Sequence, residues 1–181
     1  MKDKKLLAIL ATKSNKERLI SEGYTVSRLI SAGYTVSELI SEGYTVSRLI
    51  SEGYTVSELI SEGYLNDIEG WDRIPKLEKP YSKLWEEIQA KKRLHNQSDW
   101  GPSTCPTHDN ICKTPMCTAG HLVNMAGSIG YELQQKYGWA GAASLIHAKS
   151  CPDLPEQNYG AIKQEWALAF IECNAELESK K

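Results

Sequence analysis

The chain has 181 residues, of which 41% are hydrophobic and 24% charged, and its formal net charge is −2 at pH 7. This composition is ordinary for a soluble protein, no apolar run approaches the ~18 residues that cross a membrane, and the charge argues against a dedicated polyanion binder. The five cysteines accompany no recognisable export signal, so reduced thiols in a cytoplasm are expected.

Residues 1–14 predict a helix that caps the N-terminal end of a repeat array. Asp3 is suited to the N-cap position, and Ile9–Leu10 align with Leu19–Ile20 ten residues later. Terminal units of repeat arrays are usually atypical, because one of their sides faces water. We therefore expect residues 1–14 to form a degenerate starting unit.

Residues 15–64 consist of one ten-residue unit written five times: NKERLISEGY, TVSRLISAGY, TVSELISEGY, TVSRLISEGY and TVSELISEGY. The threonine that opens a unit is a good helix N-cap, and a glutamate three residues later completes a capping box, as in Thr35 with Glu38 and Thr55 with Glu58. The glycine near the end of each unit suits the left-handed residue that ends a helix. The pattern therefore predicts one short helix per unit.

Helices this short are not stable alone, so the units are expected to stack as an α-solenoid. The leucine of each unit should lie between the tyrosines on either side of it, in hydrophobic-staple and Schellman contacts. If consecutive units stack, their fourth residues could form a ladder of opposite charges made by Arg28, Glu38, Arg48 and Glu58.

Two other architectures for the repeats are less consistent with the sequence. A pentapeptide β-solenoid would bury a row of carboxylates, namely Glu22, Glu42, Glu52 and Glu62. A DNA-binding helix-turn-helix resembles RLISEGYTVSRLI, but the strict ten-residue recurrence leaves no room for a longer recognition helix. The repeats also carry more acidic than basic residues, which disfavours phosphate binding.

The repeat pattern stops after Tyr64, and a short linker is expected at residues 65–80, docking the next domain on the last repeat. Residues 81–181 predict a small, mainly helical domain. Its expected helices are Tyr81–Leu94, Thr118–Tyr137 ending at Gly138, Trp139–Lys149 and Ile162–Glu178. Small residues of the second helix, such as Gly120 and Gly130, should allow close approach by another helix. The buried face of the last helix is expected to be Trp166, Phe170, Cys173 and Leu177.

The segments IPKLEKPYSKLWEEI, CKTPMCTAGHLVNMAGSIGYEL and WAGAASLIHAKS resemble an uncharacterised family of phages and bacteria. Members of that family carry a Cys-Gly-Thr-x-x-Cys-x-Ala-Gly-Trp-like signature and often follow solenoid repeats. Cys112 and Cys117 match the two cysteines and Ala119–Gly120 the Ala-Gly pair, while His121 stands in place of tryptophan. The resemblance covers residues 71–175 and implies a phage or prophage context, without an established activity.

The densest group of potential metal ligands in the chain is Cys105, His108, Cys112, Cys117 and His121. Thiolate and imidazole ligands suit zinc, although these spacings match no standard zinc knuckle. The alternative is a loop whose cysteines and histidines are packed or exposed and bind no metal, so no cofactor is predicted.

Cys117 also opens a predicted helix, where the helix dipole is expected to lower the pKa of a thiol. With His121 or His147 as the base, Cys117 would be a candidate nucleophile. The alternative is a small buried cysteine at a helix start, and Cys173 is expected in the core of the last helix.

Together these patterns favour a non-enzymatic interaction or assembly module, located in the host cytoplasm or a virion, that binds a protein partner or its own copies but neither nucleic acid nor membrane. The alternative hypothesis is a cysteine- or zinc-dependent enzyme with its site around residues 105–121. The predicted interaction surface of the repeats consists of Tyr24, Tyr34, Tyr44, Tyr54, Arg28, Glu38, Arg48 and Glu58.

Overall fold

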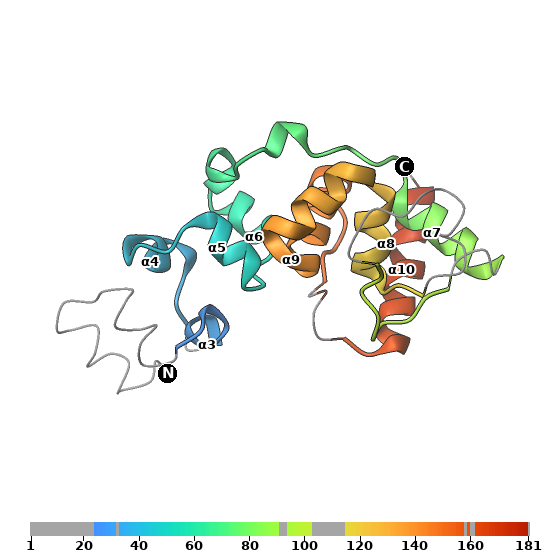
Figure 1. Cartoon of the computed structure of the whole chain (residues 1–181), viewed down its shortest axis with the longest axis horizontal. Coiled ribbons are helices and arrows are strands. Elements are labelled where there is room, and N and C mark those ends of the chain that lie inside the picture. The colour runs from blue at the N-terminus through green and yellow to red at the C-terminus, as the bar shows by residue number, and fades with distance from the viewer. Residues whose placement is uncertain are drawn as a thin grey trace.

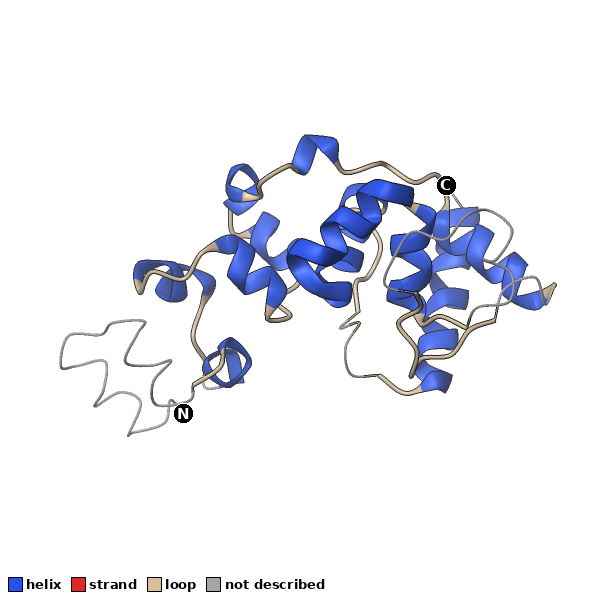
Figure 2. Cartoon of the chain, viewed as in Figure 1, coloured by secondary structure: helices blue, strands red, loops and turns tan. Residues whose placement is uncertain are grey.

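The computed structural model describes residues 24–31, 33–90, 94–102, 115–157, 159 and 162–180. Apart from one bridge between His95 and Met116, the regular elements in these ranges are helices (Figure 1, Figure 2), which confirms the predicted all-α class. The predicted helix at 1–14 and nearly all of the first repeat lie outside the described residues.

The helices fall into a repeat part and a C-terminal part, joined by a linker that contains two short 3-10 helices. The repeat helices are α3 (Val26–Ser31), α4 (Val36–Ser41), α5 (Val46–Ser51) and α6 (Val56–Ser61), and the linker contains η1 (Tyr64–Asp67) and η2 (Trp71–Arg73). The C-terminal part contains α7 (Pro80–Gln89), α8 (Thr118–Met125), α9 (Gly127–Ser150) and α10 (Gln164–Ser179). Figure 1 shows α9 between the repeat helices and the group formed by α7, α8 and α10.

The repeat helices begin at threonine caps, as the sequence predicts. The side chains of Thr35, Thr45 and Thr55 each accept a hydrogen bond from the backbone N–H three residues later. In α4 and α6, the glutamate at that position bonds back to the threonine N–H and so completes the predicted capping box. Each cap satisfies backbone donors that a six-residue helix would otherwise leave open to water.

Glycine ends each described repeat helix in the left-handed region, with φ values of 89, 84, 95 and 91° at Gly33, Gly43, Gly53 and Gly63. The following tyrosine closes a Schellman motif: Tyr44 N–H donates to the Leu39 carbonyl at 3.1 Å, and Tyr54 N–H to the Leu49 carbonyl at 3.0 Å. The leucines are fully buried in the same apolar cluster as these tyrosines, so the predicted Schellman geometry is confirmed.

Contacts between the repeat units join segments that are not adjacent in sequence. The Val26 N–H donates to the Glu52 carboxylate at 3.1 Å, and the Tyr64 hydroxyl donates to Ser37 Oγ at 3.2 Å. The charge ladder suggested by the sequence is not formed at Arg48, whose guanidinium pairs with Glu52 of its own helix at 2.9 Å.

The C-terminal part contains one helix break that the sequence predicts and one that it does not. Gly138 has φ 73° and interrupts α9, where the predicted helix ends. The predicted helix from Thr118 is also divided earlier, because Gly127 has φ 63° and separates α8 from α9. The chain doubles back so closely that a Cβ on Gly130 would lie 2.1 Å from the Val123 carbonyl oxygen. This approach explains the small residue at Gly130.

The predicted buried face of α10 is correct for Phe170 and Leu177, which pack against the core, and wrong for Trp166 and Cys173. Trp166 is 68% exposed and Cys173 is exposed. The buried face instead carries Ala167, Ile171, Asn174 and Glu178, and α10 packs through it on α7. Asn174 and Glu178 are polar, so a hydrophobicity pattern does not assign them to a buried face. Both make hydrogen bonds there.

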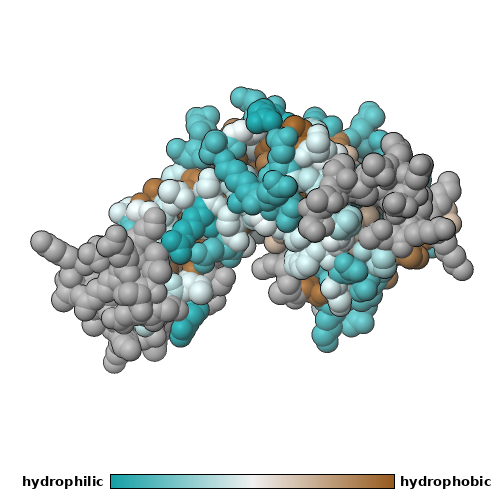
Figure 3. Space-filling model, viewed as in Figure 1, coloured by the Kyte–Doolittle hydropathy of each residue, from teal (hydrophilic) through white to brown (hydrophobic). Residues whose placement is uncertain are grey.

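The linker lies along α9 and is held by polar contacts. Lys136 pairs with Glu69 at 2.5 Å, Arg73 pairs with Glu132 at 3.0 Å, and the Tyr137 hydroxyl donates to the Glu69 carbonyl at 3.3 Å. Figure 3 shows this side of the molecule as mainly hydrophilic, with small separate hydrophobic patches. Beneath it, a single cluster of buried apolar residues extends from the repeats to α10. No helix among the described residues is long and apolar enough to span a membrane.

Candidate functional site

Cys117, the candidate nucleophile, is the N-cap of α8. Its thiol accepts a hydrogen bond from the Gly120 N–H at 3.4 Å, and the side chain is 1% exposed. Burial raises the pKa of the Cys117 thiol, because removing the thiolate from water outweighs the stabilisation from the surrounding N–H groups. The predicted lowering of this pKa is therefore wrong, and the described geometry assigns Cys117 a capping role.

His121 lies one turn after Cys117 and is fully buried. Its Nε2 lies 3.3 Å from the Leu94 carbonyl oxygen, and its ring stacks on that of His95 at 5.9 Å between centroids. His95 in turn contacts Thr118 Oγ1 at 3.1 Å and Gln164 Nε2 at 2.9 Å. Burial lowers the pKa of His95 to about 4, so this imidazole is neutral near pH 7. The two rings hold the segment at 94–97 against α8 and α10.

The predicted zinc ligands are only partly within the described residues. Cys105, His108 and Cys112 lie outside them. Within the described ranges, no three residues of the types His, Cys, Asp or Glu are placed so that they could hold a metal ion. Zinc binding at residues 105–121 therefore stays an untested alternative.

His147, the other predicted base, belongs to a buried hydrogen-bond chain that the sequence does not reveal. The Tyr159 and Tyr81 hydroxyls lie 2.9 Å apart, and the Tyr81 hydroxyl lies 2.6 Å from His147 Nδ1. His147 Nε2 lies 3.3 Å from the Leu154 carbonyl oxygen. A neutral imidazole protonated at Nε2 satisfies the chain, since Tyr81 then donates to Nδ1 and Nε2 donates to Leu154.

The energetics of this chain favour its neutral form. Burial lowers the pKa of His147 to about 4 and raises the pKa of the Tyr81 and Tyr159 hydroxyls well above their ordinary value. All three side chains are at most 2% exposed. This hydrogen-bond chain therefore fixes α7, α9 and the segment around Leu154 relative to one another.

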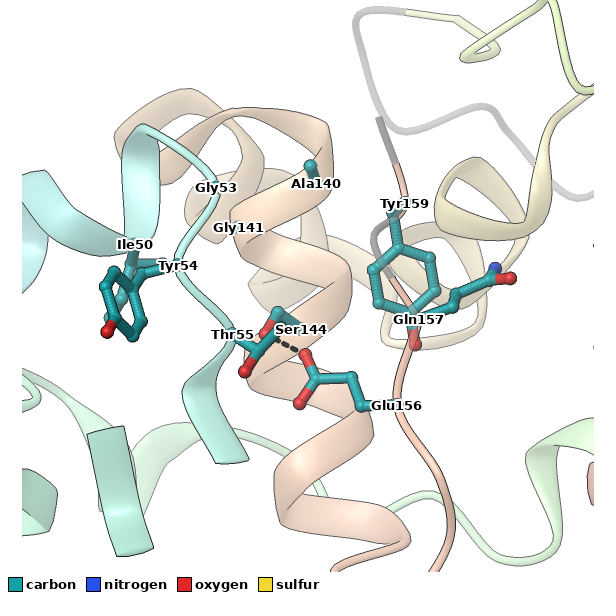
Figure 4. A pocket seen from close by; sticks show the side chains of 10 residues that line it. All are labelled: Ile50, Gly53, Tyr54, Thr55, Ala140, Gly141, Ser144, Glu156, Gln157 and Tyr159. Atoms are coloured by element: carbon teal, nitrogen blue, oxygen red, sulfur yellow. Dashed lines mark hydrogen bonds between the residues drawn. The ribbon is translucent and has the colours of Figure 1, made fainter. Parts of the chain in front are cut away.

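The junction between the repeats and α9 contains a second buried polar cluster (Figure 4). The Val56 N–H donates to Ser144 Oγ at 2.8 Å, the Ser57 N–H donates to the Glu156 carboxylate at 3.2 Å, and the Ser57 hydroxyl donates to the same carboxylate at 2.5 Å. The Ser144 hydroxyl also donates to Glu156. Burial raises the pKa of the Glu156 carboxyl, and the nearby charge of Glu58 raises it further.

Apolar contact at this junction depends on a glycine. A Cβ on Gly141 would lie 2.9 Å from Ile50 Cγ2 and 3.1 Å from the Ile50 carbonyl oxygen. The remaining cavity between α5, α6, α9 and Glu156 measures about 10 Å³, which holds at most about one water molecule. This cluster is therefore an interface within the chain, and it has no room for a ligand.

Sequence reasoning missed the residues that build this junction. Ser144 is a single hydroxyl in an otherwise apolar run, and Glu156 lies in a proline-bounded loop. A serine in a buried helical face is a weak signal of a specific contact. Nothing in the local sequence indicates that Glu156 reaches a helix about a hundred residues earlier.

The predicted interaction surface of the repeats needs a correction. Tyr34, Tyr44 and Tyr54 are buried, and the backbone N–H of each one donates to the carbonyl of the leucine in its own unit. The guanidinium groups of Arg28 and Arg48 lie 5.3 Å from the ring centroids of Tyr24 and Tyr44. The arginines and the glutamates Glu38 and Glu58 remain at least partly exposed, so the polar members of the predicted surface are accessible and most of the tyrosines are not.

A groove does open on the repeats, between α4, α5 and η1. Its volume is about 290 Å³, near the lower end of the range for ligand pockets. The groove is lined by Ile40, Tyr44, Thr45, Val46, Ser47, Tyr64 and Asp67. Ile40 and Ser47 are half-buried and Thr45 and Asp67 are exposed, so an apolar floor is bordered by hydroxyl groups and one carboxylate.

Comparison of the chain with protein-family models, curated proteins and solved structures gave no match. The resemblance of residues 71–175 to a phage and bacterial family accordingly stays a prediction.

Proposed function

We propose that the chain is an α-solenoid interaction module, which binds a protein partner through its repeats and is closed at one end by the C-terminal helices. The observation that carries this proposal is the groove between α4, α5 and η1, about 290 Å³ in volume and formed almost entirely by repeat residues. Such a groove, with an apolar floor and a polar rim, has the anatomy of a docking surface on a repeat protein.

The predicted catalytic residues support the same proposal. Cys117 caps α8, His121 contacts a backbone carbonyl, and His147 belongs to a buried hydrogen-bond chain. Each of these side chains is at most 1% exposed, and the pKa of the Cys117 thiol is raised by burial. A nucleophile needs access and an available thiolate, so these three residues favour structural roles over the cysteine-dependent enzyme.

The resemblance to phage and bacterial domains suggests the setting in which the partner would be found. A protein encoded by a phage or prophage would meet its partner in the host cytoplasm or within the virion. This context determines which extracts are used to search for the partner.

A pair of tryptophan variants tests the proposal. Ser47→Trp fills the groove, whereas Ser51→Trp places the same side chain one turn later in α5, at an exposed position that does not line the groove. Each full-length protein is immobilised and exposed to extracts of phage-infected and uninfected bacteria, and bound proteins are quantified by mass spectrometry. We expect a protein that binds the wild type and Ser51→Trp but is depleted on Ser47→Trp.

Self-association is measured in parallel by light scattering over a wide range of protein concentration. A mass that rises with concentration and is held at the monomer value by Ser47→Trp would identify a second copy as the partner. Equal capture by both variants, together with a constant monomer mass, would contradict the proposed function.

A further inference from the structure

The groove between α4 and α5 is formed by the same repeat positions as a second surface, ten residues later in the sequence, which packs against α9. Its repeat-derived lining is Ile40, Tyr44, Thr45, Val46 and Ser47. The junction with α9 uses the residues of the same type at Ile50, Tyr54, Thr55, Val56 and Ser57. The eight residues ISEGYTVS are identical at 40–47 and 50–57.

At the second of these surfaces, the structure shows which residues pack against the repeat. Gly141 of α9 lies against Ile50, Ser144 accepts a hydrogen bond from the backbone of α6, and the Glu156 carboxylate accepts from the Ser57 hydroxyl (Figure 4). The occupant is thus a helix face of glycine, alanine and serine, accompanied by a carboxylate. A small-residue face is needed because the backbones approach too closely for a larger side chain at Gly141.

The first surface has the same residues but no such cover among the described parts of the chain. Ile50 is completely buried under α9, whereas its equivalent Ile40 is only partly buried. The groove at Ile40 keeps about 290 Å³ of open volume, against about 10 Å³ at the junction. The segment η1 borders this groove through Tyr64 and Asp67 and does not fill it.

The residue that follows the serine differs in charge between the two surfaces. At the junction, the charge of Glu58 raises the pKa of the Glu156 carboxyl and so disfavours its ionised form. Ten residues earlier the equivalent position is Arg48. A carboxylate near Ser47 would therefore lie close to Arg48, which also pairs with Glu52, where Glu156 lies close to the anion Glu58. Asp67 borders the same groove and opposes this effect in part.

From these equivalences, and resting on the proposed function, we propose that the groove between α4 and α5 binds a partner helix with a face of glycine, alanine and serine and an adjacent carboxylate. The partner imitates the contact that α9 and Glu156 make one repeat later. The small residues pack on Ile40 and Tyr44, and the carboxylate accepts a hydrogen bond from the Ser47 hydroxyl beside Arg48.

The chain supplies its own probe for this surface. The peptide of residues 139–157, with C151S to prevent oxidation, carries Gly141, Ser144 and Glu156. It is titrated into isotope-labelled full-length protein, and amide shifts are followed by NMR. We expect saturable shifts at 45–47, which G141L in the peptide abolishes and E156Q weakens by about tenfold, the typical effect of losing a charge-assisted hydrogen bond.

Two protein variants provide matched controls. Arg48→Glu converts the unit at 45–54 into TVSELISEGY, a sequence that this chain already folds at 35–44 and 55–64, so the helix should be retained. It should weaken peptide binding by about threefold to tenfold. Arg28→Glu makes the same change in α3, outside the groove, and should leave binding unchanged.

The possible results separate the partner chemistry from the proposed function. Shifts confined to 55–57 would mean that the peptide only displaces the chain's own α9, and equal binding of the G141L peptide would remove the small-residue requirement; either result overturns the inference. Absence of any shift at 45–47, with capture or self-association that still depends on Ser47, would also overturn it but leave the proposed function standing. Peptide binding without any effect of Ser47→Trp on capture or mass would instead contradict the proposed function.

Discussion

Single glutamates connect distant parts of this molecule by capping helices that belong to other segments. Glu52 accepts a hydrogen bond from the first turn of α3, Glu156 from α6, and Glu178 from α7. The first N–H groups of a helix have no partner within the helix, and the helix dipole favours negative charge there. Each carboxylate thus stabilises the first turn of a helix that is distant in sequence but close in the folded structure. No local sequence pattern could have predicted these partners.

Glu178 provides the sharpest test of this role. Its buried carboxylate accepts from the Tyr81 N–H at 3.3 Å and the Ser82 N–H at 2.8 Å. Glu178→Ala should lower the free energy of unfolding by about 2–3 kcal/mol, because two backbone donors lose their partner. Glu178→Gln keeps an acceptor and should cost less. Urea unfolding measures both, with the exposed Glu176→Ala on the same helix as the control; an effect no larger than that of the control would refute the capping role.

The buried His147 predicts how stability depends on pH. Its pKa is lowered to about 4 by burial, whereas histidine in an unfolded chain titrates near 6.5. Below pH ~6.5 the unfolded chain therefore binds a proton that the folded chain does not. The free energy of unfolding consequently decreases as the pH falls from ~6.5 towards ~4. Above pH ~6.5 the imidazole is neutral in both states, and His147 causes no such loss of stability.

Replacing this histidine by a residue that does not titrate should flatten the pH dependence. His147→Gln can still accept a hydrogen bond from Tyr81. The loss of unfolding free energy between pH 7.5 and pH 5 should be smaller in this variant than in the wild type, as measured by urea unfolding at both values. His95 has a similarly lowered pKa and remains in the variant, so part of the slope should persist. An unchanged slope would show that His147 does not titrate with the assigned shift.

At the scale of elements, local signals predicted the repeats well and failed where tertiary contacts decided. The threonine caps, the capping boxes at Thr35 and Thr55 and the left-handed glycines are all found, because each depends on residues a few positions apart. On α10 the sequence identifies Phe170 and Leu177 but not Asn174 and Glu178, which are buried and make hydrogen bonds to distant segments. The break at Gly127 was missed because apolar residues continue on both sides of it.

The glycine ends of the repeat helices can be tested separately from packing. Gly63 has φ 91°, and a Cβ there would meet no atom within 4 Å. The cost of Gly63→Ala therefore comes from the left-handed backbone alone and should be about 1–2 kcal/mol. Gly63→Asn should cost less, since asparagine tolerates this region better. Thermal and urea unfolding measure these effects. Ser61→Ala, at an exposed position of α6, is the control, and a cost for Gly63→Ala within that of the control would contradict the assignment.

At the scale of the whole molecule, the repeats and the C-terminal helices share one apolar core. That core continues from Val26 in α3 to Ala175 in α10, and α9 lies between the two parts. The sequence places a linker at 65–80, and the structure shows this linker held along α9 by ion pairs. What the sequence could not indicate is the contact between Gly141 and Ile50, because its two sides are about ninety residues apart.

This contact predicts that the two parts are energetically coupled. Gly141→Ala brings a Cβ to 2.9 Å from Ile50 Cγ2 and should cost about 1–3 kcal/mol through overpacking. Ile50→Ala removes a fully buried side chain and should cost about 2–5 kcal/mol. Because Ile50→Ala also removes the atom that Gly141→Ala strikes, the double variant should be more stable than the sum of the single effects, by about 1 kcal/mol.

A second pair of variants serves as the control for this coupling. Leu84→Ala in α7 removes a buried side chain far in sequence from the junction and outside its lining, so its effect should add to that of Gly141→Ala. Additive effects for Gly141→Ala with Ile50→Ala would show that the close approach carries no energy. Two separate unfolding transitions in the wild type would show that the repeats fold independently of α9. Coupling in a single transition would instead mean that α9 and the repeat helices unfold as one cooperative unit.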